Sequence, residues 1–200
     1  VRVGIIGLGN RGNTLLEMFQ YLSENNHAEI VALSDILEKK VNSASEKLSA
    51  WQKKKAKLYY KTQNDWKKLC QRDDIDLVII ATPWDLHTPM ALYAMENGKH
   101  VACEVPISST IEDCWSLIQT AERTKKHCIM MENCNYNEEE LWILNMIQEG
   151  VFGDITHTEG AYLHDLRALM LHDTYYQDQW RLHEHSERNG NFYTTHGLGP

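Results

Sequence analysis

GIIGLGNRG, residues 4–12, is the stretch that decides the fold. Its three spaced glycines, Gly7, Gly9 and Gly12, follow an apolar strand and precede a helical pattern, the context that a dinucleotide-binding GxGxxG turn requires. Gly7 allows the tight turn, Gly9 lets the backbone approach a pyrophosphate, and Gly12 permits close packing of the helix, whose N-terminus favours anions. The stretch therefore predicts a phosphate-binding turn between a strand and a helix.

The second expected strand ends in Asp35, about 20 residues after Gly12, where a carboxylate can accept both ribose hydroxyls of NAD and repel a 2′-phosphate. We therefore expect NAD rather than NADP, although Lys39 and Lys40 follow nearby. The alternative is a glycine-rich turn and a capping aspartate that bind no nucleotide.

Apolar strands alternate with amphipathic helices up to about residue 131, which is typical of a parallel sheet covered on both faces. Strands are expected at 1–6, 30–34, 77–81, 100–103 and 128–131. The predicted fold class is α/β: an N-terminal Rossmann domain with a doubly wound parallel sheet over 1–132, and the start of an α+β domain over 133–200. In the second domain we expect a helix near 138–148, with Leu141, Leu144 and Ile147 on one face, and a strand near 154–163. The 68 residues after the boundary are few for a covered sheet, so we expect this domain to be truncated.

One helix is expected after Thr110, which with Asp113 forms a capping-box-like start. Its apolar side chains recur at helical spacing and are expected to cover the sheet: Ile111, Cys114, Trp115, Ile118 and Ala121.

Composition excludes several classes of protein. The net charge of −8 argues against a polyanion-binding role, and we interpret Lys53, Lys54, Lys55 and Lys57 as the solvated face of a helix and not a nucleic-acid patch. The five cysteines are odd in number and show no CxxC spacing, which gives neither a disulfide framework nor a zinc site. No apolar run approaches the roughly 20 residues of a membrane span, so we expect a soluble chain, either cytoplasmic or exported.

Two strand ends carry candidate site residues. The loop ATPWDLH, residues 81–87, offers Trp84 as a stacking or packing surface, and His87 either as a ligand contact or as the polar first turn of the next helix. HVACEVP, residues 100–106, ends in Glu104 and Val105, and a valine cannot transfer a proton.

Histidines gather in the last part of the chain: His164, His172, His183, His185 and His196. No HxxxH or HExxH pair occurs, so we expect no metal site. In a strand, Tyr162 and His164 would share one face, with Asp165 on the other, so that Asp165 or Arg167 would hold neighbouring structure. His196 precedes Gly197 and Gly199, where an imidazole can approach a ligand closely and titrate near neutrality; the alternative is a turn-stabilising histidine.

Five motifs together resemble the Gfo/Idh/MocA oxidoreductase family and, more narrowly, the NAD-dependent α-N-acetylgalactosaminidases of glycoside hydrolase family 109. They are GLGNRG, ATPWDLHTPMALYAMENGKHVACEVP, MMENCNY, EGAYLHDLR and NFYTTHGLGP. The first two are shared by many sugar dehydrogenases, whereas EVP, AYLHDLR and the last motif are more specific. Thr194 departs from the pattern, because these glycosidases usually have proline there.

The resemblance implies which residues act. Dehydrogenases of the family carry a catalytic lysine in a Glu-Lys-Pro triplet where this chain has Val105, so the reactive groups are expected in the second domain. It implies His196 and Tyr162 as catalytic acid/base residues, in either order, and Arg181 and Tyr193 as further sugar-binding residues. The NAD contacts it implies, together with the glycine-rich turn, are Gly7, Gly9, Asn10, Arg11, Gly12, Asp35, Trp84, Asp85, Leu86, His87, Glu104, Val105 and Asn133.

The implied activity is glycoside hydrolysis with tightly held NAD and no net redox change, an exception to the two-carboxylate mechanism of most glycosidases. Hydride leaves C3 of a terminal α-N-acetylgalactosamine, the ketone acidifies the C2 proton, its loss expels the group at C1, water adds, and the hydride returns. The alternatives are an NAD-dependent sugar dehydrogenase or a non-catalytic NAD or sugar sensor. A carbohydrate is the expected partner, nucleic acid is not, and a homo-oligomer is compatible with the sequence.

Overall fold

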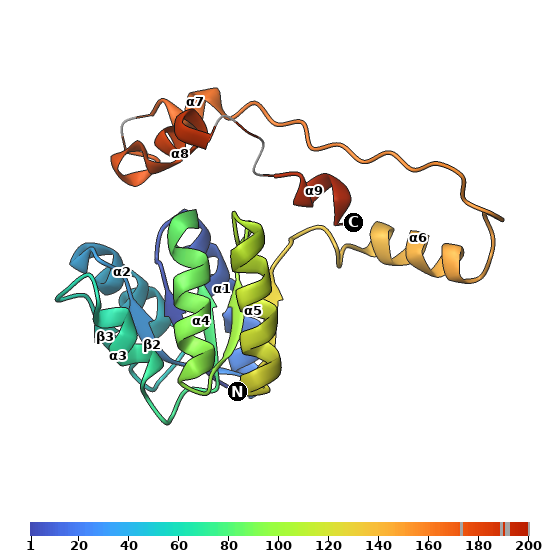
Figure 1. Cartoon of the computed structure of the whole chain (residues 1–200). Helices are drawn as coiled ribbons and strands as arrows, with labels where there is room; N and C mark the ends of the chain where they lie inside the picture. Colours follow the sequence, from blue (N-terminus) through green and yellow to red (C-terminus); the bar gives the residue numbers. More distant parts are fainter. Residues whose placement is uncertain (173, 189, 191–192, 200) are drawn as a thin grey trace. The chain divides into compact units, whose positions relative to one another are not determined.

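The structure is a computed structural model that describes all residues except 173, 189, 191–192 and 200 (Figure 1). The chain forms two compact units, Val1–Met131 and Glu132–Pro200. Asn191, Phe192 and Pro200 of the last sequence motif lie outside the described residues.

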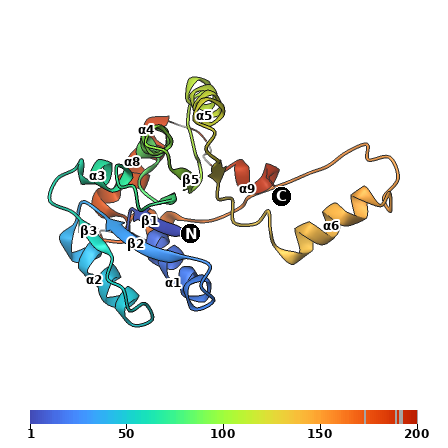
Figure 2. The same cartoon turned by 90° about the horizontal axis from the view of Figure 1, so that it is seen from below.

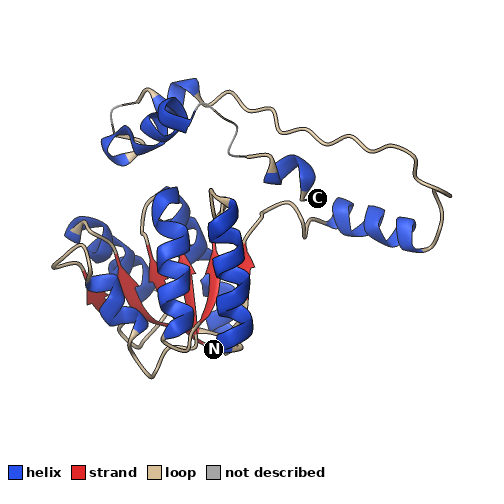
Figure 3. Cartoon of the chain, viewed as in Figure 1, coloured by secondary structure: helices blue, strands red, loops and turns tan. Residues whose placement is uncertain are grey.

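The first unit is a doubly wound α/β domain, which confirms the predicted fold class (Figure 3). All five strand pairs are parallel, and the strand order is β3-β2-β1-β4-β5-β6, the arrangement of dinucleotide-binding sheets. The strands are β1 (Arg2–Ile6), β2 (Glu29–Ser34), β3 (Lys57–Tyr59), β4 (Leu77–Ile80), β5 (His100–Cys103) and β6 (Cys128–Met130). The helices are α1 (Asn10–Glu24), α2 (Glu38–Ser49), α3 (Asp65–Cys70), the 3₁₀ turn η1 (Trp84–Leu86), α4 (His87–Glu96) and α5 (Ile111–Thr124).

Helices cover both faces of the sheet, because successive strand side chains point to opposite faces (Figure 2). In β1, Val3 and Ile5 pack with α1 and α2, whereas Ile6 packs with the cluster that includes α3 and α4. Gly4 lies under α3, where an added Cβ would come 2.7 Å from a methyl carbon of Leu69. The strands are thus buried from both sides, which leaves their ends for polar residues.

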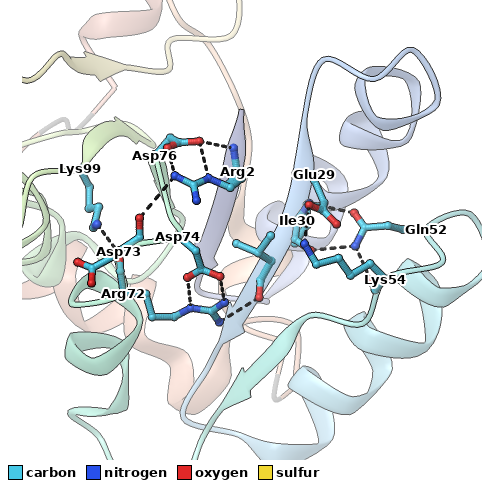
Figure 4. A network of polar contacts seen from close by, with 11 residues as sticks. Arg2, Glu29, Ile30, Gln52, Lys54, Arg72, Asp73, Asp74, Asp76 and Lys99 are labelled. Carbon is cyan, nitrogen blue, oxygen red and sulfur yellow. Dashed lines mark hydrogen bonds and ion pairs between the residues drawn. The ribbon is translucent and has the colours of Figure 1, made fainter.

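A polar network closes the amino-terminal edge of this sheet (Figure 4). Arg2 donates to both carboxylate oxygens of Asp76, at 2.7 and 3.1 Å, and holds the pKa of that carboxyl well below its usual range. The side-chain amide of Gln52 takes the place of a neighbouring strand beside Ile30. It donates to the Ile30 carbonyl and accepts from the Ile30 N–H, each at 2.9 Å. Backbone groups that would otherwise be unpaired at the edge are therefore satisfied by side chains.

Three predictions for this unit were wrong in detail. The short strand β3 was not predicted, and the lysines interpreted as a helix face lie in the loop before β3 and at its first residue, Lys57. Thr110 does cap α5, since its hydroxyl accepts from the Asp113 N–H at 3.1 Å. Of the apolar row predicted on α5, Ala121 packs against the core, but Ile111, Trp115 and Ile118 are at least half exposed and Cys114 is exposed.

The face of α5 that does pack on the sheet carries Leu117, Thr120 and Ala121. It contains the polar Thr120, whose hydroxyl accepts from Arg123, at 3.5 Å. A helix with apolar residues on two faces can bury either of them, so periodicity alone did not identify the packed one.

In the second unit the structure has α6 (Glu138–Gln148), α7 (Arg167–Met170), the 3₁₀ turn η2 (Gln177–Gln179), α8 (Trp180–Arg188) and α9 (Thr195–Leu198). Helix α6 has the predicted bounds, but its expected apolar face is 41–49% exposed. The predicted strand at 154–163 is wrong: this segment is a loop, because no described residue pairs with it, and a strand needs a hydrogen-bonded neighbour (Figure 3). Within the described part of the chain, no helix has the length and apolar character of a membrane span.

Candidate functional site

The glycine-rich turn is built so that two of its glycines are sterically required and the third borders open space. Gly7 has a φ of +89°, and an added Cβ would lie 2.5 Å from the Ala81 carbonyl oxygen at the end of β4. An added Cβ on Gly12 would lie 1.9 Å from the Gly7 oxygen, whereas one on Gly9 would meet no atom within 4 Å. Gly9 is also the N-cap of α1 and has no side chain to occupy the first-turn amides. The turn therefore offers an uncovered helix N-terminus of the kind that binds phosphate.

Asp35 lies next to this turn, directly after β2. One of its carboxylate oxygens accepts from the Leu8 N–H at 2.8 Å, and the other accepts from the Leu37 N–H at 2.9 Å. Asn13, which the sequence reasoning missed, donates to the carbonyl oxygens of Leu8 and Gly9 at 2.8 and 3.0 Å. These bonds fix the turn in place and hold Asp35 where a ribose bound at the end of β2 would lie.

The loop after β4 divides the predicted contacts into buried and exposed residues. Asp85 and Leu86 are exposed, whereas Trp84 and His87 are 4% and 1% exposed, respectively. Trp84 is thus a buried side chain and not an exposed stacking surface. His87 sits at the first turn of α4, with its ring nitrogens 2.7 Å from the Pro106 oxygen and 2.8 Å from the Thr82 oxygen. Burial lowers the pKa of His87, although the two carbonyls and the carboxylates of Glu104 and Asp85 oppose this shift.

The loop after β5 carries an ion pair at the same edge of the sheet. Glu104 is buried, and one of its oxygens accepts from Nε of Arg11, on the first turn of α1, at 2.7 Å. Val105 is 6% exposed and precedes Pro106 through a cis peptide bond. Residues expected from three strand ends, β1, β4 and β5, are thereby brought to one carboxyl edge, the place where ligands bind in doubly wound sheets.

A second candidate centre lies within the second unit and is organised by Glu132, a residue that the sequence reasoning did not single out. Its side chain is fully buried, and one oxygen accepts from the N–H groups of Cys134 and Asn135 at 2.7 and 2.8 Å. The other oxygen bonds to Nδ1 of His196, on α9. Burial raises the pKa of Glu132, but the bonds from His196 and the two N–H groups outweigh it and hold the pKa below its ordinary value. Glu132 is therefore an ionised orienting partner for the imidazole.

Aromatic rings surround His196. Tyr193 stacks on it with centroids 5.0 Å apart and an 11° angle between planes, and Tyr162 lies at 4.9 Å, tilted by 45°. The Arg181 guanidinium lies 4.6 Å from the Tyr193 ring centroid. The structure thus brings together the four residues predicted to be catalytic or sugar-binding.

Two glycines permit this cluster. An added Cβ on Gly160 would lie 1.8 Å from the Gly197 oxygen, so the segment that carries Tyr162 crosses α9 in direct backbone contact. Tyr162 and His164 lie on a loop and not on the expected strand, yet they contact each other, with the Tyr162 hydroxyl 2.7 Å from Nδ1 of His164. A cavity of about 220 Å³, lined in part by Tyr162, Tyr193 and His185, opens beside the rings.

Several of the remaining expected residues line the cavity beside the rings: Asp165, Arg167 and His185. Asp165 and Arg167 form an exposed ion pair at 2.7 Å. Asn133, an expected NAD contact, is exposed and belongs to the second unit. His183 and His185, two of the histidines in the last part of the chain, lie on α8. Across the described residues, no three His, Cys, Asp or Glu side chains converge as metal ligands.

Two family models match the chain. Residues 1–132 match the oxidoreductase family with the NAD-binding Rossmann fold, and residues 136–200 match the C-terminal domain of glycosyl hydrolase 109. An α-N-acetylgalactosaminidase of Shewanella oneidensis is 46% identical over 200 residues, which is 100% of this chain and 43% of that protein. A glycosyl hydrolase family 109 protein of Saccharopolyspora erythraea is 44% identical over the same shares. The chain thus spans less than half the length of these curated relatives.

The fold of this chain is similar to those of several solved structures. An NAD-binding protein from Listeria innocua superposes with a TM-score of 0.61 at 29% identity over 76% of this chain and 41% of that one. The scyllo-inositol dehydrogenase of Lactobacillus casei, solved with NAD(H) and scyllo-inositol, gives 0.67 at 22% identity over 78% and 43%. The second likeness supports the fold alone.

Proposed function

The chain belongs to the Gfo/Idh/MocA oxidoreductase family with its NAD-binding Rossmann fold, and from this premise we propose that it is part of an NAD-dependent glycosidase. The proposed substrate is a terminal α-N-acetylgalactosaminide, cleaved without net oxidation or reduction. Support comes from the glycosyl hydrolase 109 model over residues 136–200 and from the relative named α-N-acetylgalactosaminidase.

The first unit fits the cofactor. The space beside Gly9, in front of the first turn of α1, suits a pyrophosphate, and Asp35 suits the adenosine ribose. Bound NAD would supply reversible hydride transfer at C3 of the sugar. Arg11, Glu104 and Val105 would border the remaining half of the cofactor, since Arg11 begins α1 after β1, the other two follow β5, and Arg11 pairs with Glu104.

The oriented histidine of the second unit carries the assignment of a glycosidase. A buried valine, Val105, occupies the position where dehydrogenases of the family have a catalytic lysine. The carboxylate of Glu132 accepts a hydrogen bond from Nδ1 of His196, which leaves Nε2 as the atom that exchanges a proton. In this proposal His196 takes the proton of the C3 hydroxyl and later returns it. The ketone formed at C3 acidifies the C2 proton, whose loss expels the group at C1.

Tyr162 would exchange the proton at C2 or at the leaving group, and the two roles could be reversed between Tyr162 and His196. Their rings lie 4.9 Å apart, so both can reach neighbouring atoms of one sugar. Arg181 and Tyr193 would hold the sugar, because the guanidinium over the Tyr193 ring presents donors beside an aromatic surface.

A plain NAD-dependent sugar dehydrogenase is the second candidate, favoured by the oxidoreductase family of the first unit. It differs in one respect that can be measured, because it would release reduced cofactor in proportion to substrate.

The test is to incubate the purified protein with an α-N-acetylgalactosaminide, without added cofactor, and to follow sugar release and reduced NAD together. We expect sugar release with no net reduced NAD, abolished by His196→Ala and retained in His157→Ala, which changes an exposed histidine outside the cluster. Reduction of NAD in proportion to substrate, without bond cleavage, would reject the glycosidase and favour the dehydrogenase. NAD binding with neither product would favour a sensor.

A further inference from the structure

His87 is buried between two loops of the predicted cofactor edge. Its ring is 1% exposed, one nitrogen faces the Thr82 oxygen after β4, and the other faces the Pro106 oxygen after β5. The neighbouring Thr88 hydroxyl donates to the Ile107 oxygen at 3.1 Å. The first turn of α4 is therefore bonded to both loops through side chains.

The ring has no polar atom left for a ligand. Carbonyl oxygens only accept, so an imidazolium, with two N–H groups, donates to both loops, whereas a neutral imidazole, with one N–H, donates to one of them. Both ring nitrogens of His87 already lie 2.7–2.8 Å from backbone oxygens. The ring thus connects the loops from inside the fold and does not face the space where a cofactor would lie.

The two loops border the cofactor site on its β4 and β5 side. Ala81, the neighbour of Thr82, contacts Gly7 of the glycine-rich turn. Glu104, two residues before Pro106, pairs with Arg11 on α1. With the pyrophosphate at the end of β1 and the adenosine ribose at the end of β2, the other half of a dinucleotide must extend toward β4 and β5.

We propose that His87 is a positioning residue for the nicotinamide half of the cofactor: by tying Thr82 to Pro106 it sets the spacing of the β4 and β5 loops without touching the cofactor. This proposal rests on the proposed use of NAD, but it is independent of the glycosidase reaction.

The test compares two ligands by titration calorimetry on the full chain: NAD⁺, and ADP-ribose, which lacks nicotinamide. In His87→Phe, which keeps a ring but removes both nitrogens, we expect the NAD⁺ dissociation constant to rise about tenfold and that of ADP-ribose less than about twofold. His87→Asn keeps a donor near the position of Nδ1 and His87→Gln near that of Nε2, so at least one of them should restore most of the preference for NAD⁺.

Gln52→Leu is the matched control, because Gln52 is also buried and its side chain also bonds to backbone groups, three of them, but at the opposite edge of the sheet. It should lower the melting temperature and leave the ratio of the two dissociation constants unchanged. Equal weakening of both ligands in His87→Phe would overturn the positioning role, as would failure of both amide variants to restore the preference.

Nitrogen NMR gives a readout that does not depend on any variant folding. The ring ¹⁵N shifts of His87 should stay nearly constant when NAD⁺ is added, since the same two carbonyls hold the ring in both states. A large shift on addition of NAD⁺, absent with ADP-ribose, would mean direct contact and would refute the proposal. Failure of the unaltered protein to bind either ligand would instead reject the proposed function.

Discussion

Replacing Gly9 by alanine should abolish tight NAD binding and leave the fold intact. Gly9 has φ −72° and ψ −162°, a conformation open to alanine, and an added Cβ would meet no protein atom within 4 Å. The methyl group would instead occupy the space in front of the α1 N-terminus, where a pyrophosphate would lie. Because alanine also restricts the unfolded chain, we expect stability to be unchanged or higher by up to about 1 kcal/mol.

Gly12→Ala should instead lower the stability of the fold, and it serves as the comparison. Its Cβ would lie 1.9 Å from the Gly7 oxygen, well inside the ordinary contact distance of about 3.4 Å. The start of α1 or the turn must therefore shift by more than about 1 Å. Forcing extra volume into a packed site typically costs about 1–3 kcal/mol, and a backbone contact lies at the upper end of that range.

The assay measures the free energy of unfolding by urea denaturation without ligand, and the NAD⁺ dissociation constant by calorimetry. We expect at least a tenfold weaker complex for Gly9→Ala with an unchanged or higher denaturation midpoint, and a lower midpoint for Gly12→Ala. Normal NAD⁺ affinity in Gly9→Ala would refute the placement of the phosphate, and an unchanged midpoint in Gly12→Ala would refute the steric argument.

Three further predictions concern charge and packing. The pKa of Glu132 is lower in the folded state than its ordinary value of 4.5, so its ionised form should stabilise the fold above that pH. This contribution should disappear as the pH falls through the folded-state pKa. The difference in melting temperature between the unaltered protein and Glu132→Gln should therefore shrink on acidification. The hydrogen bond from Lys68, with those from the Lys61 N–H and the Thr62 hydroxyl, lowers the pKa of Asp65 to about 2. Asp65→Asn should therefore lower the free energy of unfolding fully at neutral pH, and this loss should vanish only toward about pH 2. Equal losses at both pH values would contradict this. Gly160→Ala should separate Tyr162 from His196, because its Cβ would lie 1.8 Å from the Gly197 oxygen. We therefore expect the proposed glycosidase activity to fall at least tenfold while NAD⁺ affinity stays normal; unchanged turnover would argue against this crossing.

Much of the first unit could be predicted because its strands are short apolar runs and its turn glycines have specific steric tasks. The strand β3 escaped detection because it has three residues, begins with Lys57 and follows a lysine-rich loop. The buried face of α5 was misjudged because Leu117 and Thr120 offer a less apolar row than the exposed Trp115 and Ile118. Burial depends on which neighbour a helix meets, and the periodicity of one helix does not contain that information.

The candidate site was predicted as a set of residues, but not as a set of contacts. Arg11 and Glu104 were expected as separate NAD contacts, and the structure pairs them with each other. Glu132 lay inside a recognised motif, yet its role depends on a bond to a residue 64 positions away, His196. A contact over such a separation arises from tertiary structure, and the local pattern around either residue does not reveal it.

The polar network at the amino-terminal edge has a consequence for how this protein can change over time. Arg2, Asp76, Gln52 and Ile30 fasten the strands at one end, while every predicted cofactor contact of the first unit lies at or near the other end. Substitutions in the loops after β4 and β5 therefore need not disturb the fastening. A lineage could replace Val105 by another residue, such as lysine, and change the chemistry of the site with little loss of folding stability.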